Sequence, residues 1–158
     1  MPAAHTEILE SDSPAATAAL AERVLARLPG RAVLALHGEL GSGKTCFVQG
    51  LAAAMGLRAM VTSPTFTLVH EHCGGARPLV HIDLYRIRDA SDALQLGFED
   101  YLAGEGVCAV EWPERAEALF PPDTVHLLFE VLTEPDRRRI TIQWPAGRAF
   151  ARPAGCLD

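Results

Sequence analysis

The chain has 158 residues, is 49% hydrophobic and carries a formal net charge of −6, which argues against tight binding of nucleic acid by this chain alone. A chain of this length buries about two thirds of its unfolded surface, so we expect one domain over residues 1–158 with a core that needs no disulfide or structural metal. Because it contains neither a run of about 18 apolar residues nor a start typical of a signal peptide, we expect a cytoplasmic protein without a membrane span.

The N-terminal part predicts an edge strand, a helix and a buried strand. Residues 7–10 have the pattern of a short edge strand. A helix is expected from Ser13, as its N-cap, through about Leu28, because Pro14 suits the first helical turn and a Pro-Gly pair follows the last one. The apolar run at 32–36 then indicates a buried strand.

Residues 38–45 read G-E-L-G-S-G-K-T and complete the pattern of a phosphate-binding loop. The loop follows the buried strand and precedes apolar residues at helical spacing, so it has the flanking elements that phosphate binding requires. We expect Lys44 to contact the β- and γ-phosphate oxygens and the Thr45 hydroxyl to bind Mg²⁺. A glycine-rich turn that caps an ordinary helix is the alternative. The nucleotide-binding residues that the loop itself predicts are Gly41, Ser42, Gly43, Lys44 and Thr45.

The middle of the chain predicts a loop, a hairpin and a broken helix. Residues 61–66 are polar and interrupted by proline, which is typical of a loop. The segments 67–72 and 79–83 predict antiparallel strands joined at a Gly-Gly turn. Residues 89–102 have a helical pattern that Gly97 is expected to divide.

The last third completes a mixed sheet. Residues 107–111 form a continuous apolar run that ends in an acid, the pattern of a fully buried parallel strand. Pro113 opens a short helix, and 125–132 with 138–144 predict a second antiparallel hairpin. The tail at 145–158 is expected to fray. These elements predict an α/β fold, a P-loop NTPase-like three-layer sandwich with a parallel core and antiparallel hairpins.

Two acids at strand ends compete for the second contact with Mg²⁺. Ligands of open α/β sheets bind at the carboxyl ends of parallel strands. Glu111 ends the most apolar run, whereas Asp83 ends a run interrupted by His81 and belongs to a hairpin. We therefore favour Glu111 for the metal, directly or through water, and Asp83 either for orienting a water or for contacting one of the metal's own ligands. Capping of the following segment is the alternative for each acid.

Three further features have more than one interpretation. The hydroxyl-bearing segment 63–67 has the composition of a loop that orders around a γ-phosphate, but also that of a plain connector. His70, His72 and His81 lack the partners of a metal site and are expected at the surface. Arg137, Arg138 and Arg139 fit a solvated strand end or a contact with nucleotide, RNA or an acidic partner. The four cysteines lack a C-x-x-C pair, which favours reduced thiols.

Four motifs together resemble the TsaE (YjeE) family in order and spacing: G-E-L-G-S-G-K-T at 38–45, S-P-T-F-T-L-V at 63–69, H-I-D-L-Y-R at 81–86 and V-E-W-P-E-R at 110–115. The resemblance covers about residues 7–144, the expected ordered core. It implies an ATPase component of bacterial threonylcarbamoyladenosine synthesis, which modifies tRNAs that read codons starting with adenine. The resemblance also implies that ATP hydrolysis with Mg²⁺ resets an assembly with the TsaB and TsaD proteins, through which tRNA is contacted indirectly.

The resemblance also assigns roles to single residues. Lys44 and Thr45 match the loop lysine and the Mg²⁺ hydroxyl, Thr65 lies in the segment likened to switch I, and Asp83 lies in that likened to switch II. Glu111 matches the Mg²⁺-associated glutamate, with Trp112 as the aromatic residue beside it. Cys46 stands where many relatives carry a second threonine, which leaves its backbone N–H for the α-phosphate. We thus expect catalytic roles for Lys44, Thr65, Asp83 and Glu111, and metal contacts from Thr45 and Glu111.

Two other functions are compatible with a phosphate-binding loop on a chain of this size. A small P-loop kinase of a nucleotide or small molecule needs an acceptor pocket and usually an arginine-bearing lid. No central segment of the sequence is rich enough in arginine for such a lid. Nucleotide binding as a purely structural device is disfavoured by the two acids placed to work with Mg²⁺.

Overall fold

A seven-stranded mixed sheet forms the centre of the computed structural model, which describes residues 3–57, 68–75 and 77–147. Its strands are β1 (His5–Ser11), β2 (Arg31–His37), β3 (Val69–His72), β4 (Leu79–Asp83), β5 (Gly106–Glu111), β6 (Val125–Val131) and β7 (Arg138–Trp144). They lie in the order β1-β7-β6-β2-β5-β4-β3. Neighbours from β6 to β4 are parallel, whereas β7 and β1 on one side and β3 on the other are added antiparallel. The predicted parallel core with antiparallel hairpins is confirmed.

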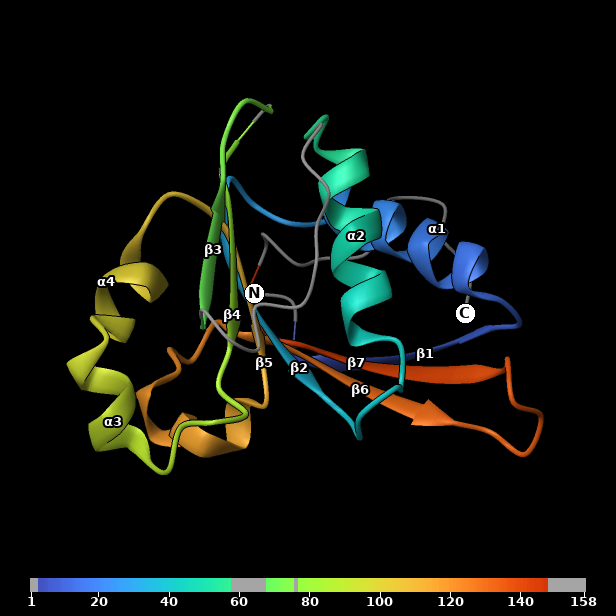
Figure 1. Ribbon diagram of the computed structural model, residues 1–158. Coiled ribbons are helices and arrows are strands. Elements are labelled where there is room, and N and C mark those ends of the chain that lie inside the picture. Colours follow the sequence, from blue (N-terminus) through green and yellow to red (C-terminus); the bar gives the residue numbers. More distant parts are fainter. Residues whose placement is uncertain (1–2, 58–67, 76, 148–158) are drawn as a thin grey trace.

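Helices cover both faces of this sheet. They are α1 (Pro14–Leu25), α2 (Lys44–Ala54), α3 (Ala90–Gln95), α4 (Phe98–Ala103) and the 3₁₀ helix η1 (Pro113–Leu119). Helices α1 and α2 lie side by side over one face, and α3 and α4 lie beyond β4 on the other side (Figure 1). Each helix layer has its own hydrophobic core, one that includes Phe47 and Ile142 and one that includes Phe98 and Val110. The arrangement is the predicted three-layer sandwich.

The most apolar strands occupy the middle of the sheet. All six residues of β5 are buried, and so are the five inner residues of β2. A continuous apolar run suits a parallel strand with helices on both faces, because neither of its side-chain rows meets water. The two strands pair in register from Arg31 with Gly106 to Leu36 with Glu111. Their carboxyl ends therefore meet beside the loop that follows β2.

Local signals set most element boundaries. The Ser13 hydroxyl accepts the N–H of Ala16 at 3.0 Å, as predicted for an N-cap. Helix α1 ends at Leu25 rather than Leu28, because the N–H groups of Arg27 and Leu28 donate to carbonyls three residues earlier instead of four. Gly97, with φ of 76°, separates α3 from α4 as expected. The predicted loop at 61–66 lies outside the described residues, as does most of the C-terminal tail.

The described helices are short compared with a lipid bilayer. The longest of them, α1, has 12 residues, whereas a span needs about 20. None of the helices in residues 3–57, 68–75 and 77–147 combines the length and the apolar character that a bilayer crossing demands.

Candidate functional site

The glycine-rich loop connects the carboxyl end of β2 to the first turn of α2. Gly38 has φ of 147°, and a Cβ at this position would lie 2.7 Å from both the Phe129 carbonyl and the Ser42 hydroxyl, so a larger residue does not fit. Gly43, the N-cap of α2, has φ of 106° and supplies no side-chain cap. The first N–H groups of α2 thus lack a capping side chain, and an uncapped helix N-terminus behind a glycine loop is suited to bind phosphate.

Lys44 is held close to this loop. Its Nζ donates to the Gly38 carbonyl at 2.5 Å and lies 4.0 Å from the centroid of the Trp112 ring. Burial lowers the pKa of Lys44 from its ordinary value, and the nearby carboxylates of Glu111, Glu114 and Asp83 oppose that shift. The side chain thus places an ammonium group at the loop, among carboxylates and beside an aromatic face.

Asp83 and Glu111 end neighbouring strands at the same edge of the sheet. Strand β4 forms the predicted hairpin with β3, but its other side pairs in parallel with β5. Asp83 thus belongs to the predicted hairpin, but its strand also has a parallel neighbour, so membership of a hairpin does not by itself separate Asp83 from Glu111. What separates them is their contacts: Thr45 Oγ1 donates to Glu111 Oε2 at 3.5 Å, whereas Asp83 Oδ1 accepts the N–H of Tyr85 at 2.8 Å.

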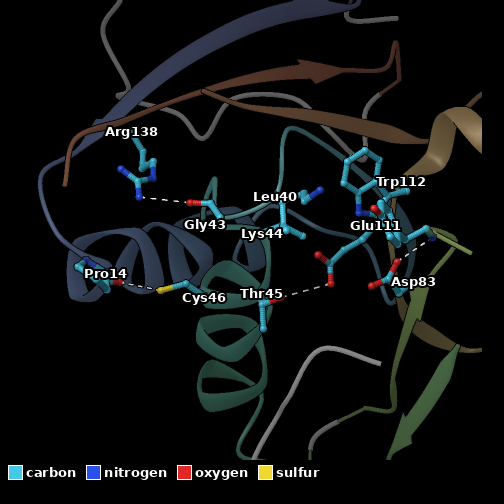
Figure 2. A pocket seen from close by; sticks show the side chains of 12 residues that line it. Pro14, Leu40, Gly43, Lys44, Thr45, Cys46, Asp83, Glu111, Trp112 and Arg138 are labelled. Atoms are coloured by element: carbon cyan, nitrogen blue, oxygen red, sulfur yellow. Dashed lines mark hydrogen bonds between the residues drawn. The ribbon is translucent and has the colours of Figure 1, made fainter. Parts of the chain in front are cut away.

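The capping alternative fits the two acids differently. Asp83 does bond the backbone just after its strand. Glu111 does not cap the next helix, because η1 has Trp112 as its N-cap, with φ of 58° and no side-chain hydrogen bond. The carboxylate of Glu111 points instead toward Thr45 at the start of α2 (Figure 2).

His81 is not at the surface, contrary to the expectation from sequence. Its side chain is fully buried, and its Nε2 lies 2.6 Å from Glu111 Oε2. His70 and His72 are partly buried on β3, with ring centroids 6.0 Å apart. Both faces of β4 are covered, so its residues do not alternate between buried and exposed positions. The hydrophobic periodicity of the sequence therefore could not predict that His81 is buried.

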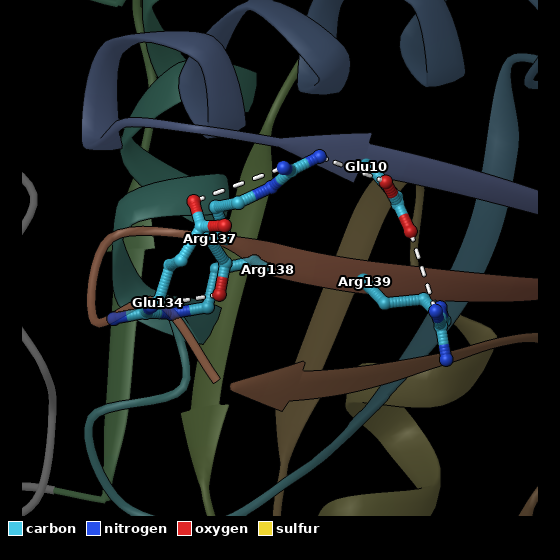
Figure 3. Close-up of polar contacts among 5 residues, drawn as sticks. All are labelled: Glu10, Glu134, Arg137, Arg138 and Arg139. Atoms are coloured by element: carbon cyan, nitrogen blue, oxygen red, sulfur yellow. Dashed lines mark hydrogen bonds and ion pairs between the residues drawn. The ribbon is translucent and has the colours of Figure 1, made fainter. Parts of the chain in front are cut away.

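The three arginines at the start of β7 point in different directions. Arg137 and Arg139 both pair with Glu10, at 3.2 and 3.3 Å, and form the solvated strand end (Figure 3). Arg138 turns toward the phosphate loop, where its Nη2 donates to the Gly41 carbonyl at 3.3 Å. Sequence reasoning treated the three as one cluster. The alternation of side chains along a strand is the signal that distinguishes Arg138 from its neighbours.

The phosphate loop, the two acids and Arg138 line one pocket of about 540 Å³ (Figure 2). It contains most of the residues predicted from sequence, namely Gly41, Gly43, Lys44, Thr45, Cys46, Asp83 and Glu111. Ser42 is buried in the same loop, and Thr65 lies outside the described residues. Sequence reasoning did not place Pro14, Leu40 and Tyr85 in this pocket, and it gave contact with a nucleotide as one of several alternatives for Arg138. Trp112, which the resemblance gave as the aromatic residue beside the Mg²⁺-associated glutamate, is half-buried and lines it.

The oxygen donors of the pocket fit Mg²⁺ bound together with a nucleotide. Mg²⁺ usually takes one or two protein carboxylates and completes its shell with phosphate oxygens and water. Thr45 and Glu111 supply a hydroxyl and a carboxylate within 3.5 Å of each other, with Asp83 as the register partner of Glu111. Within the described part of the chain, no group of three or more His, Cys, Asp or Glu side chains is placed to hold a metal ion. Phosphate oxygens and water would therefore have to supply the remaining ligands.

A parallel strand, a glycine-rich loop and a helix, with acids at the ends of the adjoining strands, define a nucleotide-binding protein of the P-loop NTPase-like class. The family model described as "Threonylcarbamoyl adenosine biosynthesis protein TsaE" matches residues 11–140. The chain therefore belongs to the TsaE family, and the resemblance found in its four motifs is confirmed.

Individual relatives support this assignment. The Bacillus subtilis "tRNA threonylcarbamoyladenosine biosynthesis protein TsaE" is 39% identical over 82% of this chain and 80% of the relative. A protein of the same name from Aquifex aeolicus is 41% identical over 85% and 92%. The crystal structure of Bacillus subtilis YdiB superposes with a TM-score of 0.79 at 32% identity, over 92% of this chain and 90% of that one.

Proposed function

We propose that this chain is a Mg²⁺-dependent ATPase that acts as a switch in the formation of threonylcarbamoyladenosine in tRNAs that read codons starting with adenine. It works with TsaB and TsaD and contacts tRNA through their assembly. Membership of the TsaE family and the names of its relatives support the pathway. One observation supports the activity: Lys44, Thr45 and Glu111 line the same pocket, at the N-terminus of a helix that has no side-chain cap.

Each group in the pocket has a task in this proposal. The backbone N–H groups of residues 41–46 bind the phosphates, and Lys44 reaches the β- and γ-phosphate oxygens. Thr45 and Glu111 hold Mg²⁺, which neutralises charge on the phosphates when it is bound. Asp83 lies beside Glu111 at the strand ends and orients a water. Trp112 packs against the lysine that must remain at the loop.

The nucleoside is expected on the Arg138 side of the pocket. A small adjoining cavity of about 50 Å³ is lined by Ser13, Pro14, Thr17, Gly43, Cys46, Asp136 and Arg138. Cys46, whose backbone N–H is assigned to the α-phosphate, lines both cavities. We therefore propose that residues around Arg138, rather than those beside the acids, would contact the nucleoside.

We expect the isolated chain to hydrolyse ATP slowly. A water between two positioned groups reacts faster than a water that one group holds, and Thr65 is our candidate for a second group beside Asp83. Positioning of reactants contributes several orders of magnitude to such a rate. A partner that aligns the water raises the rate and couples hydrolysis to the assembly.

The test is phosphate release with and without TsaB and TsaD. We expect a low basal rate that requires Mg²⁺ and rises when both partners are present. Fast turnover by the chain alone contradicts the switch. Transfer of phosphate to an added nucleoside monophosphate, measured in the same reactions, would identify a kinase instead.

A further inference from the structure

His81 and Glu111 form a fully buried contact next to the nucleotide pocket. His81 Nε2 lies 2.6 Å from Glu111 Oε2, and the two side chains are 0% and 5% exposed. In the register of β4 and β5, His81 lies opposite Ala109, and Glu111 follows two residues later on the same face. The imidazole thus reaches along the sheet toward the strand end, where the carboxylate enters the pocket.

The contact holds one particular oxygen of the carboxylate. Glu111 Oε2 accepts from His81 Nε2 and, at 3.5 Å, from Thr45 Oγ1. An ionised carboxylate has no proton to donate, so the imidazole carries the hydrogen on Nε2. Charge-assisted hydrogen bonds away from water are strong and directional. The carboxylate is therefore held from the sheet side by His81 and faces the first turn of α2.

Stability alone is a weak reason for this arrangement. Two polar groups buried together often contribute no more to folding than apolar residues of similar size. The other ring nitrogen, His81 Nδ1, is buried and has no hydrogen-bond partner among the described residues. Within that part of the chain, Glu111 is thus the single hydrogen-bond partner of the ring, as expected for a residue that orients one carboxylate.

We propose that His81 is a positioning residue, which fixes the Glu111 carboxylate in the orientation that binds Mg²⁺ with the nucleotide. The inference rests on the proposed function, because it assumes that Glu111 contacts the metal. Partners that orient a metal ligand change metal affinity or activity by about ten- to a hundredfold when they are removed. His81 is fully buried and does not line the nucleotide pocket, so its loss acts through Glu111.

Three substitutions at His81 separate this role from simple packing. In His81→Gln the amide nitrogen occupies nearly the place of Nε2, whereas in His81→Asn it is too short to reach Glu111. His81→Leu removes the donor and keeps most of the volume. The matched control is His70→Leu, because His70 is the register partner of His81 on β3. Thermal unfolding of each variant establishes that it is folded.

The primary measurement is calorimetric binding of a non-hydrolysable ATP analogue, with Mg²⁺ and with EDTA. We expect His81→Leu and His81→Asn to leave the affinity in EDTA within about twofold and to reduce the gain from Mg²⁺ by about tenfold. Because a slow chemical step makes KM equal to Kd, KM measured with Mg²⁺ should rise by a similar factor. We expect kcat to fall by about ten- to a hundredfold. His81→Gln restores most of the gain, and His70→Leu resembles the wild type.

The outcomes distinguish this inference from the function on which it rests. If folded Asn and Gln variants have the same Mg²⁺ dependence as each other, or if His81→Leu matches the wild type, His81 does not position Glu111. Should His81→Leu fail to fold, the comparison of Gln with Asn decides. If the wild-type chain binds the analogue without any Mg²⁺ dependence and hydrolyses no ATP with its partners, the proposed function itself is wrong.

Discussion

Asp83 and Glu111 are register partners on adjacent parallel strands, yet their carboxylates have different neighbours. Glu111 faces the hydroxyl of Thr45 and the ring of His81, whereas Asp83 accepts the backbone N–H of Tyr85. Equal placement at the strand ends therefore does not mean equal roles. The carboxylate beside the Thr45 hydroxyl is the better placed for a cation bound to the phosphates.

If the chain is the ATPase that we propose, Lys44→Ala and Glu111→Ala should each reduce kcat by about a hundredfold or more, because each would remove a charge that acts on the transferred phosphoryl group. Lys44→Ala should also weaken nucleotide affinity more than Glu111→Ala, since the ammonium acts on the phosphates directly. Steady-state kinetics and calorimetry measure the two effects. An active Glu111→Ala beside an inactive Asp83→Ala would transfer the metal role to Asp83.

Arg138→Leu should weaken nucleotide binding by about tenfold, the effect of losing one hydrogen bond to a charged group. The reason is that its guanidinium lies at the Gly41 carbonyl and lines the pocket. Arg139→Leu is the matched control, because that side chain pairs with Glu10 on the outer strand. Equal affinities for the two variants in a titration would remove Arg138 from the site.

Gly50→Ala should lower the free energy of unfolding by about 3 kcal/mol, the upper range for overpacking a tight core. An added Cβ would overlap the Ala18 carbonyl oxygen, so α1 and α2 would have to separate. Gly30→Ala is the control, because a Cβ there meets nothing within 4 Å. Urea unfolding measures both. A neutral Gly50→Ala would mean that α1 moves readily against α2.

The stability of the fold should fall as the pH drops below 6.5, the ordinary pKa of histidine. His37, the last residue before the phosphate loop, has its Nε2 at 3.0 Å from His126 Nδ1. Burial lowers the pKa of both rings, and the neighbouring His126 lowers the pKa of His37 further. The carboxylates of Glu114 and Glu117 oppose the shift at His37, and Glu117 also opposes the shift at His126. The unfolded chain thus takes up protons at a higher pH than the native state.

This contribution to stability is complete above the unfolded pKa and is lost as the pH falls through the lowered native values. Urea unfolding at about pH 7.5 and about pH 5.5 should reveal the loss, which His126→Phe should reduce. His72, whose pKa burial also lowers, titrates in both proteins, so the difference between them reports on the pair. An unchanged pH dependence in His126→Phe would assign it to other groups.

Much of the site was predictable because the phosphate loop is local. Eight consecutive residues, 38–45, contain the glycines, the lysine and the hydroxyl, and the flanking apolar runs indicate the strand before and the helix after. The buried parallel strand that ends in Glu111 was equally visible, since a short continuous apolar run in an α/β chain is typical of a strand covered on both faces. The division of the helical segment at Gly97 also follows from one residue.

Contacts between residues that are far apart in the sequence could not be predicted from local patterns. His81 and Glu111 are 30 positions apart, and Arg138 and Gly41 are 97 apart. Periodicity predicts whether a side chain is buried, but only strand order and register decide which neighbour it meets, because a shift of one residue turns every side chain to the other face. The sequence by itself thus determined the phosphate loop and its flanking elements, whereas the tertiary structure decided which histidine contacts the acid and which arginine reaches the loop.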